Sequence, residues 1–148
     1  MVETKRGHDL GRCISEGSAA PNSGVPGIIG GYGLERLVRA EAAGVFRGTE
    51  DIAARVQAGQ TVGYVETGRE QVPVKAQIDG VLRGILHDGV EVHPGMKAGD
   101  VDPRDVEQHC FTVSDKARAI GGGVLEAFLA AEKRRKRAVS RGTVHMVL

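Results

Sequence analysis

The sequence predicts a mainly β protein: a small closed sandwich built from two interlocked copies of a four-strand unit, with an irregular N-terminal extension and a C-terminal α-helix. Three observations support this prediction. An internal repeat runs through the middle of the chain, glycines recur at matched places in its two copies, and short valine-rich stretches lie between them. Composition agrees, since 22 of the 148 residues are Gly, Trp is absent and aromatic residues make up 3%. Such a mixture is typical of tight turns around an aliphatic core.

The repeat aligns residues 38–66 with residues 74–102 at a constant offset of 36 residues, without a gap. Matched glycines imply matched turns or close backbone approaches, and the valine-rich pieces between them are typical of strands. Each copy is too short to bury a sheet face alone, so we expect each to complete the sheets of the other. The identical pairs are Val38/Val74, Ala40/Ala76, Gly44/Gly80, Val45/Val81, Arg47/Arg83, Gly48/Gly84, Val56/Val92, Gly59/Gly95, Gly63/Gly99 and Val65/Val101.

The stretch from Leu37 to about Pro103 resembles the barrel-sandwich hybrid, the fold of biotinyl and lipoyl carrier domains, through the layout G-V-x-x-G and V-x-x-G-Q/M-x-x-G-x-V in both halves. Carrier domains of this fold hold an acceptor lysine on the hairpin that joins the halves. The joining stretch here, Glu66–Pro73, contains no lysine, and Arg69 stands at the acceptor position. A guanidinium stays protonated and is a poor amide-forming nucleophile, while Lys75 is expected to lie in a strand. We therefore expect neither biotin nor lipoate on this chain.

The predicted organisation has three parts. They are a Gly/Pro-rich N-terminal extension over residues 1–36, the barrel-sandwich hybrid over residues 37–105, and a last part over residues 106–148. The last part combines a strand-like stretch at Cys110–Val113, a Gly-rich turn and a C-terminal α-helix with a basic tail. One domain with appendages fits the length, because single domains commonly have about 100–150 residues.

The C-terminal helix is predicted from Ser114, a candidate N-cap, and from apolar residues at one-face helical spacing. Three consecutive glycines, residues 121–123, interrupt the stretch, and each costs about 1 kcal/mol relative to Ala inside a helix. We therefore expect a bend or loop at the glycines. The apolar stripe either packs on the barrel of the same chain or lies between subunits. It consists of Val124, Leu125, Phe128 and Leu129.

The formal net charge of +1 hides a strongly basic stretch, residues 132–141. Such a run is typical of a solvated helix end, and without interleaved aromatic residues it does not indicate a nucleic-acid partner. No apolar run approaches the ~18 residues of a membrane span, and the start of the chain lacks the apolar segment of a secretory signal. We expect no membrane partner and a cytoplasmic location. The stretch contains Lys133, Arg134, Arg135, Lys136, Arg137 and Arg141 beside Glu132.

The extension offers a candidate anion site. Arg6, His8 and Arg12 lie within seven residues of one another and can gather donors around an oxyanion such as a phosphate, a molybdate or a nucleotide. The alternative is a loop whose polar groups bond its own backbone. The histidines are scattered without the spacing of a zinc site, so no metal site is predicted.

Two further candidates lie after the barrel. Gly121, Gly122 and Gly123 can cradle a phosphate if they precede a helix N-terminus, although the P-loop spacing is absent; the alternative is close packing of the helix. Cys110 is a candidate nucleophile or carrier of sulfur or selenium if nearby cations such as Lys116 populate its thiolate. The alternative for Cys110 is a buried, inert thiol.

The flanks also carry a family resemblance. The strings ETKRGHDLGR, APNSGVPGIIGGYGLERLVRA, AGDVDP and CFTVSDKARAIGGGVLEA occur in this order and resemble the C-terminal part of the selenium-dependent molybdenum hydroxylase system proteins of the YqeB type. The resemblance covers nearly all of Val2 to Leu129. Position 5 departs from it, because the family's usual string is T-N-R-G-H and this chain has Lys5. Family members carry a Rossmann-like region before this part, which this sequence does not include.

The resemblance implies an accessory role, helping selenium-dependent molybdenum hydroxylases to acquire a competent active site. We expect a maturation module, not an enzyme, that docks on a hydroxylase or its maturation proteins, with a separate Rossmann-like domain as a further candidate partner. It would bind either an anionic cofactor fragment, such as a molybdenum- or selenium-containing species, or a protein. Two alternatives stay open: a sulfur or selenium transfer protein using Cys110, and a pure protein-interaction domain. The sequence leaves open which ligand is bound, which hydroxylase is served and the oligomeric state.

Overall fold

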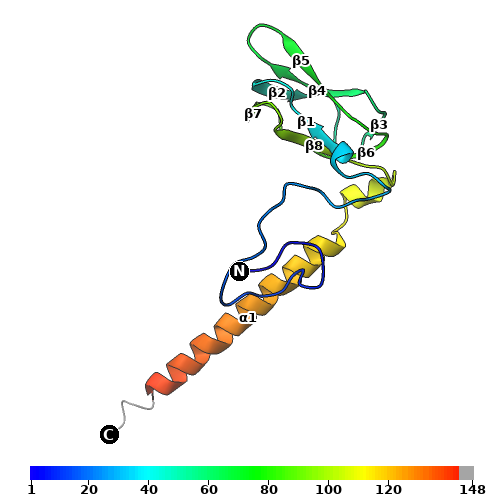
Figure 1. Ribbon diagram of the computed structural model, residues 1–148. Helices are drawn as coiled ribbons and strands as arrows, with labels where there is room; N and C mark the ends of the chain where they lie inside the picture. The colour runs from blue at the N-terminus through cyan, green and yellow to red at the C-terminus, as the bar shows by residue number, and fades with distance from the viewer. Residues whose placement is uncertain (144–148) are drawn as a thin grey trace. The chain divides into compact units, whose positions relative to one another are not determined.

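The computed structural model (Figure 1) describes residues 1–143, with side chains as far as Ser140, so Arg141 of the predicted basic stretch lies outside the described side chains. The chain forms two compact units. The barrel unit is Gly24–Thr112, and the helix unit combines Met1–Ser23 with the chain from Val113 onward. This grouping differs from the three consecutive parts predicted above, because the two ends of the chain pack together.

The barrel unit contains eight strands and two short 3-10 helices. The 3-10 helices are η1 (Leu34–Arg36) and η2 (Glu107–Cys110). The strands are β1 (Leu37–Arg39), β2 (Gly44–Gly48), β3 (Arg55–Val56), β4 (Thr61–Glu66), β5 (Gln71–Lys75), β6 (Gly80–Ile85), β7 (Glu91–Val92) and β8 (Lys97–Asp102).

The strands form two four-stranded antiparallel sheets, in the orders β1-β8-β6-β3 and β5-β4-β2-β7. Each sheet takes two strands from each copy of the repeat. The edge pairings match as well, because β1 pairs with β8 and β5 pairs with β4. The mainly β fold built from two interlocked quasi-repeats is thus confirmed, as is the placement of Lys75 in a strand.

The repeated glycines have a physical reason at one pair of positions. Gly44 and Gly80 start β2 and β6 with φ of 156° and 148°. A Cβ at Gly44 would overlap the carbonyl oxygen of Glu66, and a Cβ at Gly80 would overlap that of Asp102. Both copies therefore require glycine where a strand starts against its neighbour.

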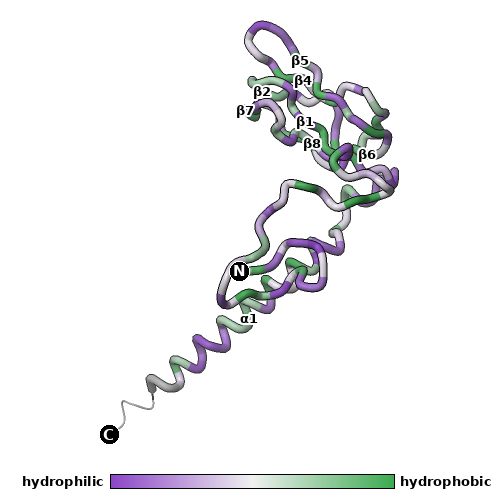
Figure 2. Tube along the Cα trace, viewed as in Figure 1, coloured by the Kyte–Doolittle hydropathy of each residue, from purple (hydrophilic) through white to green (hydrophobic). Residues whose placement is uncertain are grey.

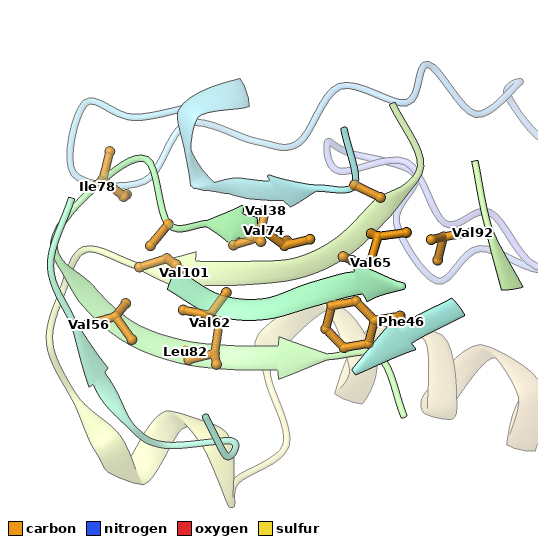
Figure 3. Close-up of a cluster of buried hydrophobic side chains, with 13 residues drawn as sticks. Val38, Phe46, Val56, Val62, Val65, Val74, Ile78, Leu82, Val92 and Val101 are labelled. Carbon is orange, nitrogen blue, oxygen red and sulfur yellow. The ribbon is translucent and has the colours of Figure 1, made fainter. Parts of the chain in front are cut away.

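The core lies between the two sheets (Figure 3) and is assembled from repeat-related pairs. Phe46 of the first copy and Leu82 of the second, 36 residues later, are both 0% exposed. Valines fill the space around them at matched positions. These are Val38 and Val74, Val56 and Val92, and Val65 and Val101. The residues of this core cluster all belong to the barrel unit.

The helix unit contains α1 (Asp115–Thr143), a continuous helix of 29 residues. The Ser114 hydroxyl accepts a hydrogen bond from the Ala117 amide at 3.1 Å, so the predicted N-cap is confirmed. The predicted bend at residues 121–123 is wrong, because the glycines continue the helix. Among the described residues, no helix is both long and apolar enough to cross a membrane.

The strand-like assignment of Cys110–Val113 is also wrong. Cys110 ends η2, and the amides of His109 and Phe111 bond to the carbonyls of Val106 and Gln108, three residues earlier in each case. The valine and aromatic content of this stretch favours a strand, but local turn bonds satisfy its backbone instead.

Candidate functional site

The N-terminal loop of the helix unit is held by a buried carboxylate. Glu3 is 8% exposed, and its side chain accepts backbone amides of Thr4, Lys5 and Ala20, each at 2.8 Å. These backbone hydrogen bonds, that from Ala20 first, lower the pKa of Glu3 below its ordinary value. Because three donors already occupy this carboxylate, Glu3 serves the architecture of the loop.

The loop packs on α1 through glycines. A Cβ at Gly11 would overlap the carbonyl oxygen of Ala119, and a Cβ at Gly123 would overlap that of Gly11. The Cys13 thiol donates to the carbonyl of Gly123 at 2.9 Å. By contrast, a Cβ at Gly121 or Gly122 would meet nothing within 4 Å. Gly123 therefore marks the closest approach of loop and helix.

This position also decides what the three glycines can do. They lie inside α1, where backbone amides bond to carbonyls of the preceding turn, and not in front of a helix N-terminus. Gly121, Gly122 and Gly123 therefore present no amide cradle to a phosphate. Close packing of the helix, the alternative given for these glycines, applies to Gly123, which meets the loop.

The two arginines among the candidate anion donors each face a carboxylate. Arg6 binds both carboxylate oxygens of Asp115, with Nη2–Oδ1 at 3.0 Å, and this contact, followed by the Lys116 amide, lowers the pKa of Asp115 to about 2. Arg12 donates to Asp9 at 2.8 Å. His8 is exposed. Both arginines thus bind carboxylates of their own unit.

A cavity of about 370 Å³ lies on this loop, and most of the charged side chains that line it are acidic: Glu3, Asp9 and Glu16 accompany Arg12. Three carboxylates against one guanidinium repel an anion. An oxyanion site at Arg6, His8 and Arg12 stays a prediction, and the charge of this cavity does not favour it.

The outer face of α1 is the most unusual surface of the helix unit. We define it as Val124, Leu125, Phe128 and Leu129, which are 56%, 58%, 61% and 57% exposed. The loop covers a different face, on which Gly123 is buried and Ala119 and Ala127 are partly buried. Within the helix unit, the loop therefore packs on the face of Ala119, Gly123 and Ala127 and leaves these four apolar side chains uncovered.

The basic surface, which we define as Lys133–Arg137, follows the outer face along α1. In Figure 2 the hydrophobic colour of the helix gives way to hydrophilic colour towards this segment. Arg135 bonds to Glu132, with Nε–Oε1 at 3.1 Å. A groove of about 540 Å³ joins the two surfaces, because its lining includes Leu129 together with cations. Those cations are Lys133, Lys136 and Arg137.

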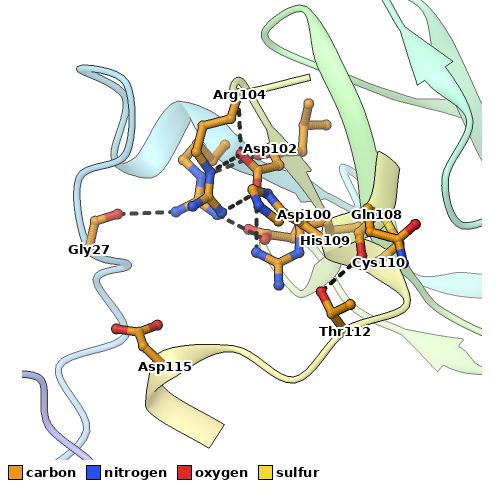
Figure 4. Close-up of polar contacts among 12 residues, drawn as sticks. Gly27, Asp100, Asp102, Arg104, Gln108, His109, Cys110, Thr112 and Asp115 are labelled. Carbon is orange, nitrogen blue, oxygen red and sulfur yellow. Dashed lines mark hydrogen bonds and ion pairs between the residues drawn. The ribbon is translucent and has the colours of Figure 1, made fainter. Parts of the chain in front are cut away.

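The barrel unit carries a charged cluster around Asp102 (Figure 4). Its carboxylate is 0% exposed and accepts from Arg104 at 2.6 and 2.9 Å and from Arg83 at 3.2 Å. The hydrogen bond from the Arg104 side chain is the main reason that the pKa of Asp102 lies well below its usual range. His109 Nδ1 lies 3.9 Å from the same carboxylate. The buried negative charge of Asp102 is thus balanced by Arg83 and Arg104, whose side chains are partly exposed.

Sequence reasoning missed this cluster, although the repeat contains a signal for it. Arg47 and Glu66 occupy the equivalent positions in the first copy and also pair, at 3.0 Å. An arginine and a carboxylate that recur together in both copies therefore indicate a cross-strand ion pair, between β2 and β4 and between β6 and β8.

Cys110 ends η2 in the barrel unit and is partly buried, with its thiol 3.9 Å from the carbonyl of Leu82. That distance is a weak contact for sulfur. Among the described residues, no three or more His, Cys, Asp or Glu side chains gather as metal ligands do. A role of Cys110 in carrying sulfur or selenium stays a prediction.

Comparison with known proteins gives one close sequence relative. The uncharacterized protein YqeB of Escherichia coli strain K12 is 45% identical over 129 residues, which cover 87% of this chain. The match supports a YqeB-type family. The chain spans only 23% of that relative's length. No protein-family model matches the sequence.

Solved structures give weaker likenesses, each over less than half of this chain. An aspartoacylase family protein of Mesorhizobium loti has a TM-score of 0.41 at 14% identity, over 45% of this chain and 22% of that one. The ectoine utilization protein DoeB of Ruegeria pomeroyi has a TM-score of 0.41 at 24% identity, over 46% of this chain and 22% of that one. The urea carboxylase of Kluyveromyces lactis has a TM-score of 0.42 at 27% identity, over 44% of this chain and 6% of that one. TM-scores this low bear on neither fold nor function.

Proposed function

We propose that this chain is a non-catalytic binding module of the machinery that matures selenium-dependent molybdenum hydroxylases, and that its ligand is a protein. The observation that carries the proposal is the open outer face of α1. Four large apolar side chains, each more than half exposed, are costly to leave in water. Contiguous apolar surface of this kind is typical of a site that a partner covers.

The residues that sequence analysis assigned to ligand binding support a protein partner over a small anion. Arg6 and Arg12 bind carboxylates of the helix and the loop, and most charged side chains of the neighbouring cavity are acidic. We keep the anionic cofactor fragment, containing molybdenum or selenium, as the competing ligand.

The hydroxylase part of the proposal rests on the YqeB-type sequence, since the strings that resemble the hydroxylase system proteins lie within the chain. The partner is a hydroxylase, one of its maturation proteins or a separate Rossmann-like domain. A cytoplasmic location belongs to the same proposal.

A complementation experiment tests the proposal. In cells that make a selenium-dependent molybdenum hydroxylase, the gene for this protein is deleted and restored, and hydroxylase activity per amount of hydroxylase is measured. We expect full activity with the wild-type chain and with Cys110→Ser. We expect at least about a tenfold loss with Leu125→Ser/Phe128→Ser, as when a central apolar anchor of an interface is removed.

The same experiment separates the competing functions. Loss of activity with Cys110→Ser, but not with the outer-face variant, would support a sulfur or selenium carrier instead. Loss with His8→Ala/Arg12→Ala alone would support the anion site. Full activity after the gene is deleted would contradict a role in hydroxylase maturation.

A further inference from the structure

We propose that the outer face of α1 docks a protein segment that carries two helical turns of apolar side chains followed by carboxylates. This inference rests on the proposed binding function and names the chemistry of the partner. Its occupant has to match two adjoining surfaces: the apolar stripe Val124–Leu129 and the basic surface that follows it.

The apolar requirement comes from the geometry of the helix. Phe128 and Leu129 follow Leu125 by three and four residues, which places all three side chains on one side of the helix, and each is more than half exposed. The loop covers the face of Ala119 and Gly123, so it does not compete for the stripe. A segment that presents complementary apolar side chains at helical or strand spacing fits here.

The acidic requirement comes from the charges. Lys133–Arg137 are five consecutive cations, all exposed, and Glu132 offsets one of them by pairing with Arg135. Lys133, Lys136 and Arg137 line the groove that continues from Leu129. Carboxylates placed just beyond the apolar part of the partner would meet these cations.

The same charges argue against a second copy of this chain as the occupant. A parallel copy would place Lys133–Arg137 beside its own equivalent. An antiparallel copy centred on the stripe would place that segment beside Lys116 and Arg118 of the other helix. Both arrangements bring like charges together, which is destabilising.

A lipid surface fits less well than a protein. Glu132 and Arg135 follow Phe128 by four and seven residues, so this ion pair lies on the same face as the stripe. A helix lying in a bilayer interface would have to bury that pair among acyl chains, which is unfavourable. A protein partner can leave it at the rim.

Two synthetic helical peptides provide the test. Both have the same leucine stripe; one has glutamates beyond the stripe and the other has lysines there. Binding of each to the full chain is measured by fluorescence anisotropy. We expect the glutamate peptide to bind at least about tenfold more tightly at low salt, with the difference shrinking at about 1 M salt, where charges are screened.

Variants assign the binding to the surface. Leu125→Ser/Phe128→Ser should abolish binding of the glutamate peptide, and Lys133→Glu/Lys136→Glu should reverse the preference between the peptides. Ile52→Ser is the matched control, because Ile52 is a 47% exposed apolar residue of the barrel unit; it should change nothing. Circular dichroism establishes that the helix content of each variant is unchanged.

Several outcomes would overturn the inference. They are equal binding of the two peptides, binding that survives Leu125→Ser/Phe128→Ser, self-association that this variant abolishes, and adsorption to phosphatidylglycerol vesicles that it abolishes. Failure of the proposed function is distinguishable. If the glutamate peptide binds as expected but Leu125→Ser/Phe128→Ser leaves hydroxylase activation intact, the docking surface is supported and the role in hydroxylase maturation is contradicted.

Discussion

The core of the barrel unit and the outer face of α1 expose their large apolar residues to opposite degrees. In the barrel unit, Phe46 and Leu82 are 0% exposed, whereas in the helix unit Phe128 and Leu129 are 61% and 57% exposed. The barrel forms both of its sheets from its own repeat, because each copy supplies two of the four strands of each sheet. In the helix unit, the loop covers the face of Ala119, Gly123 and Ala127 and leaves the outer face uncovered. This difference is the reason that we assign stability to the barrel core and propose binding for the outer face of α1.

The largest expected effect is in the barrel core. Phe46→Ala should lower the free energy of unfolding of the barrel unit by about 3–5 kcal/mol, since it removes a wholly buried ring and leaves a cavity. Hydrogen exchange of the β2 and β4 amides under increasing urea measures it. An effect under about 1 kcal/mol would mean that the barrel does not depend on this core.

The next effect separates the two repeat-related ion pairs. Asp102→Asn should destabilise the barrel by about 1–3 kcal/mol, because it removes the charge that Arg83 and Arg104 bind in a buried position. Glu66→Gln should cost about 0–1 kcal/mol, because the Arg47–Glu66 pair is partly exposed and screened by solvent. Urea unfolding of both variants checks the order. Equal costs would contradict the difference in environment.

Acid should affect the helix unit before the barrel. The pKa of Asp115 is lowered from 3.8 to about 2 by Arg6, so this contact stabilises the folded state above about pH 4 and its contribution is lost as the pH falls towards 2. The pKa of Asp102 is lowered further, so its contribution persists to lower pH. Hydrogen exchange of residues 1–23 during acidification tests this. In Asp115→Asn this step should be smaller, and the part that remains belongs to Glu3, whose pKa is also lowered.

A smaller effect distinguishes two neighbouring glycines of α1. Gly122→Ala should stabilise the helix by about 0.5–1 kcal/mol, because Ala has the higher helix propensity and the new methyl group meets open space. Gly123→Ala should instead detach the loop, because its methyl group would overlap the Gly11 carbonyl. Limited proteolysis within residues 1–23 measures the detachment. Equal protection in both variants would contradict the packing described for Gly123.

The smallest expected effect is on the outer face. Leu125→Ser/Phe128→Ser should change the free energy of unfolding of the isolated chain by no more than about 0.5 kcal/mol per site, because both side chains are mostly in solvent. Thermal unfolding followed by circular dichroism tests it. A loss as large as that of Phe46→Ala would mean that these residues stabilise the fold itself.

The sequence could predict the barrel because its information is periodic. A gapless offset of 36 residues fixes which strands correspond, and Gly44 and Gly80 repeat because both start a strand against a neighbouring carbonyl. Ser114 could be predicted as an N-cap because capping is local. These features depend on short-range or repeated patterns.

The rest depends on contacts between distant residues. Gly11 meets Gly123 across most of the chain, so propensity alone predicted a bend where packing keeps a helix. A signal was present in the spacing, because Ala119, Gly123 and Ala127 are four residues apart and place small residues on one helix face. The pairing of Asp102 with Arg83 could be predicted from the repeat, but the contacts of Asp102 with Arg104 and His109 could not, because those two residues lie beyond it.

The most direct test of the central claim, that α1 binds an acidic protein segment through its outer face, is photo-crosslinking in cells. Phe128 is replaced by p-benzoylphenylalanine in the full chain, with the same replacement of Ile52 as the control, and the crosslinked peptides are sequenced by mass spectrometry. The account predicts crosslinks from position 128, but not from position 52, to one apolar segment flanked by carboxylates in a hydroxylase or a maturation protein. Crosslinks from position 128 only to further copies of this chain, or to lipid, would contradict it.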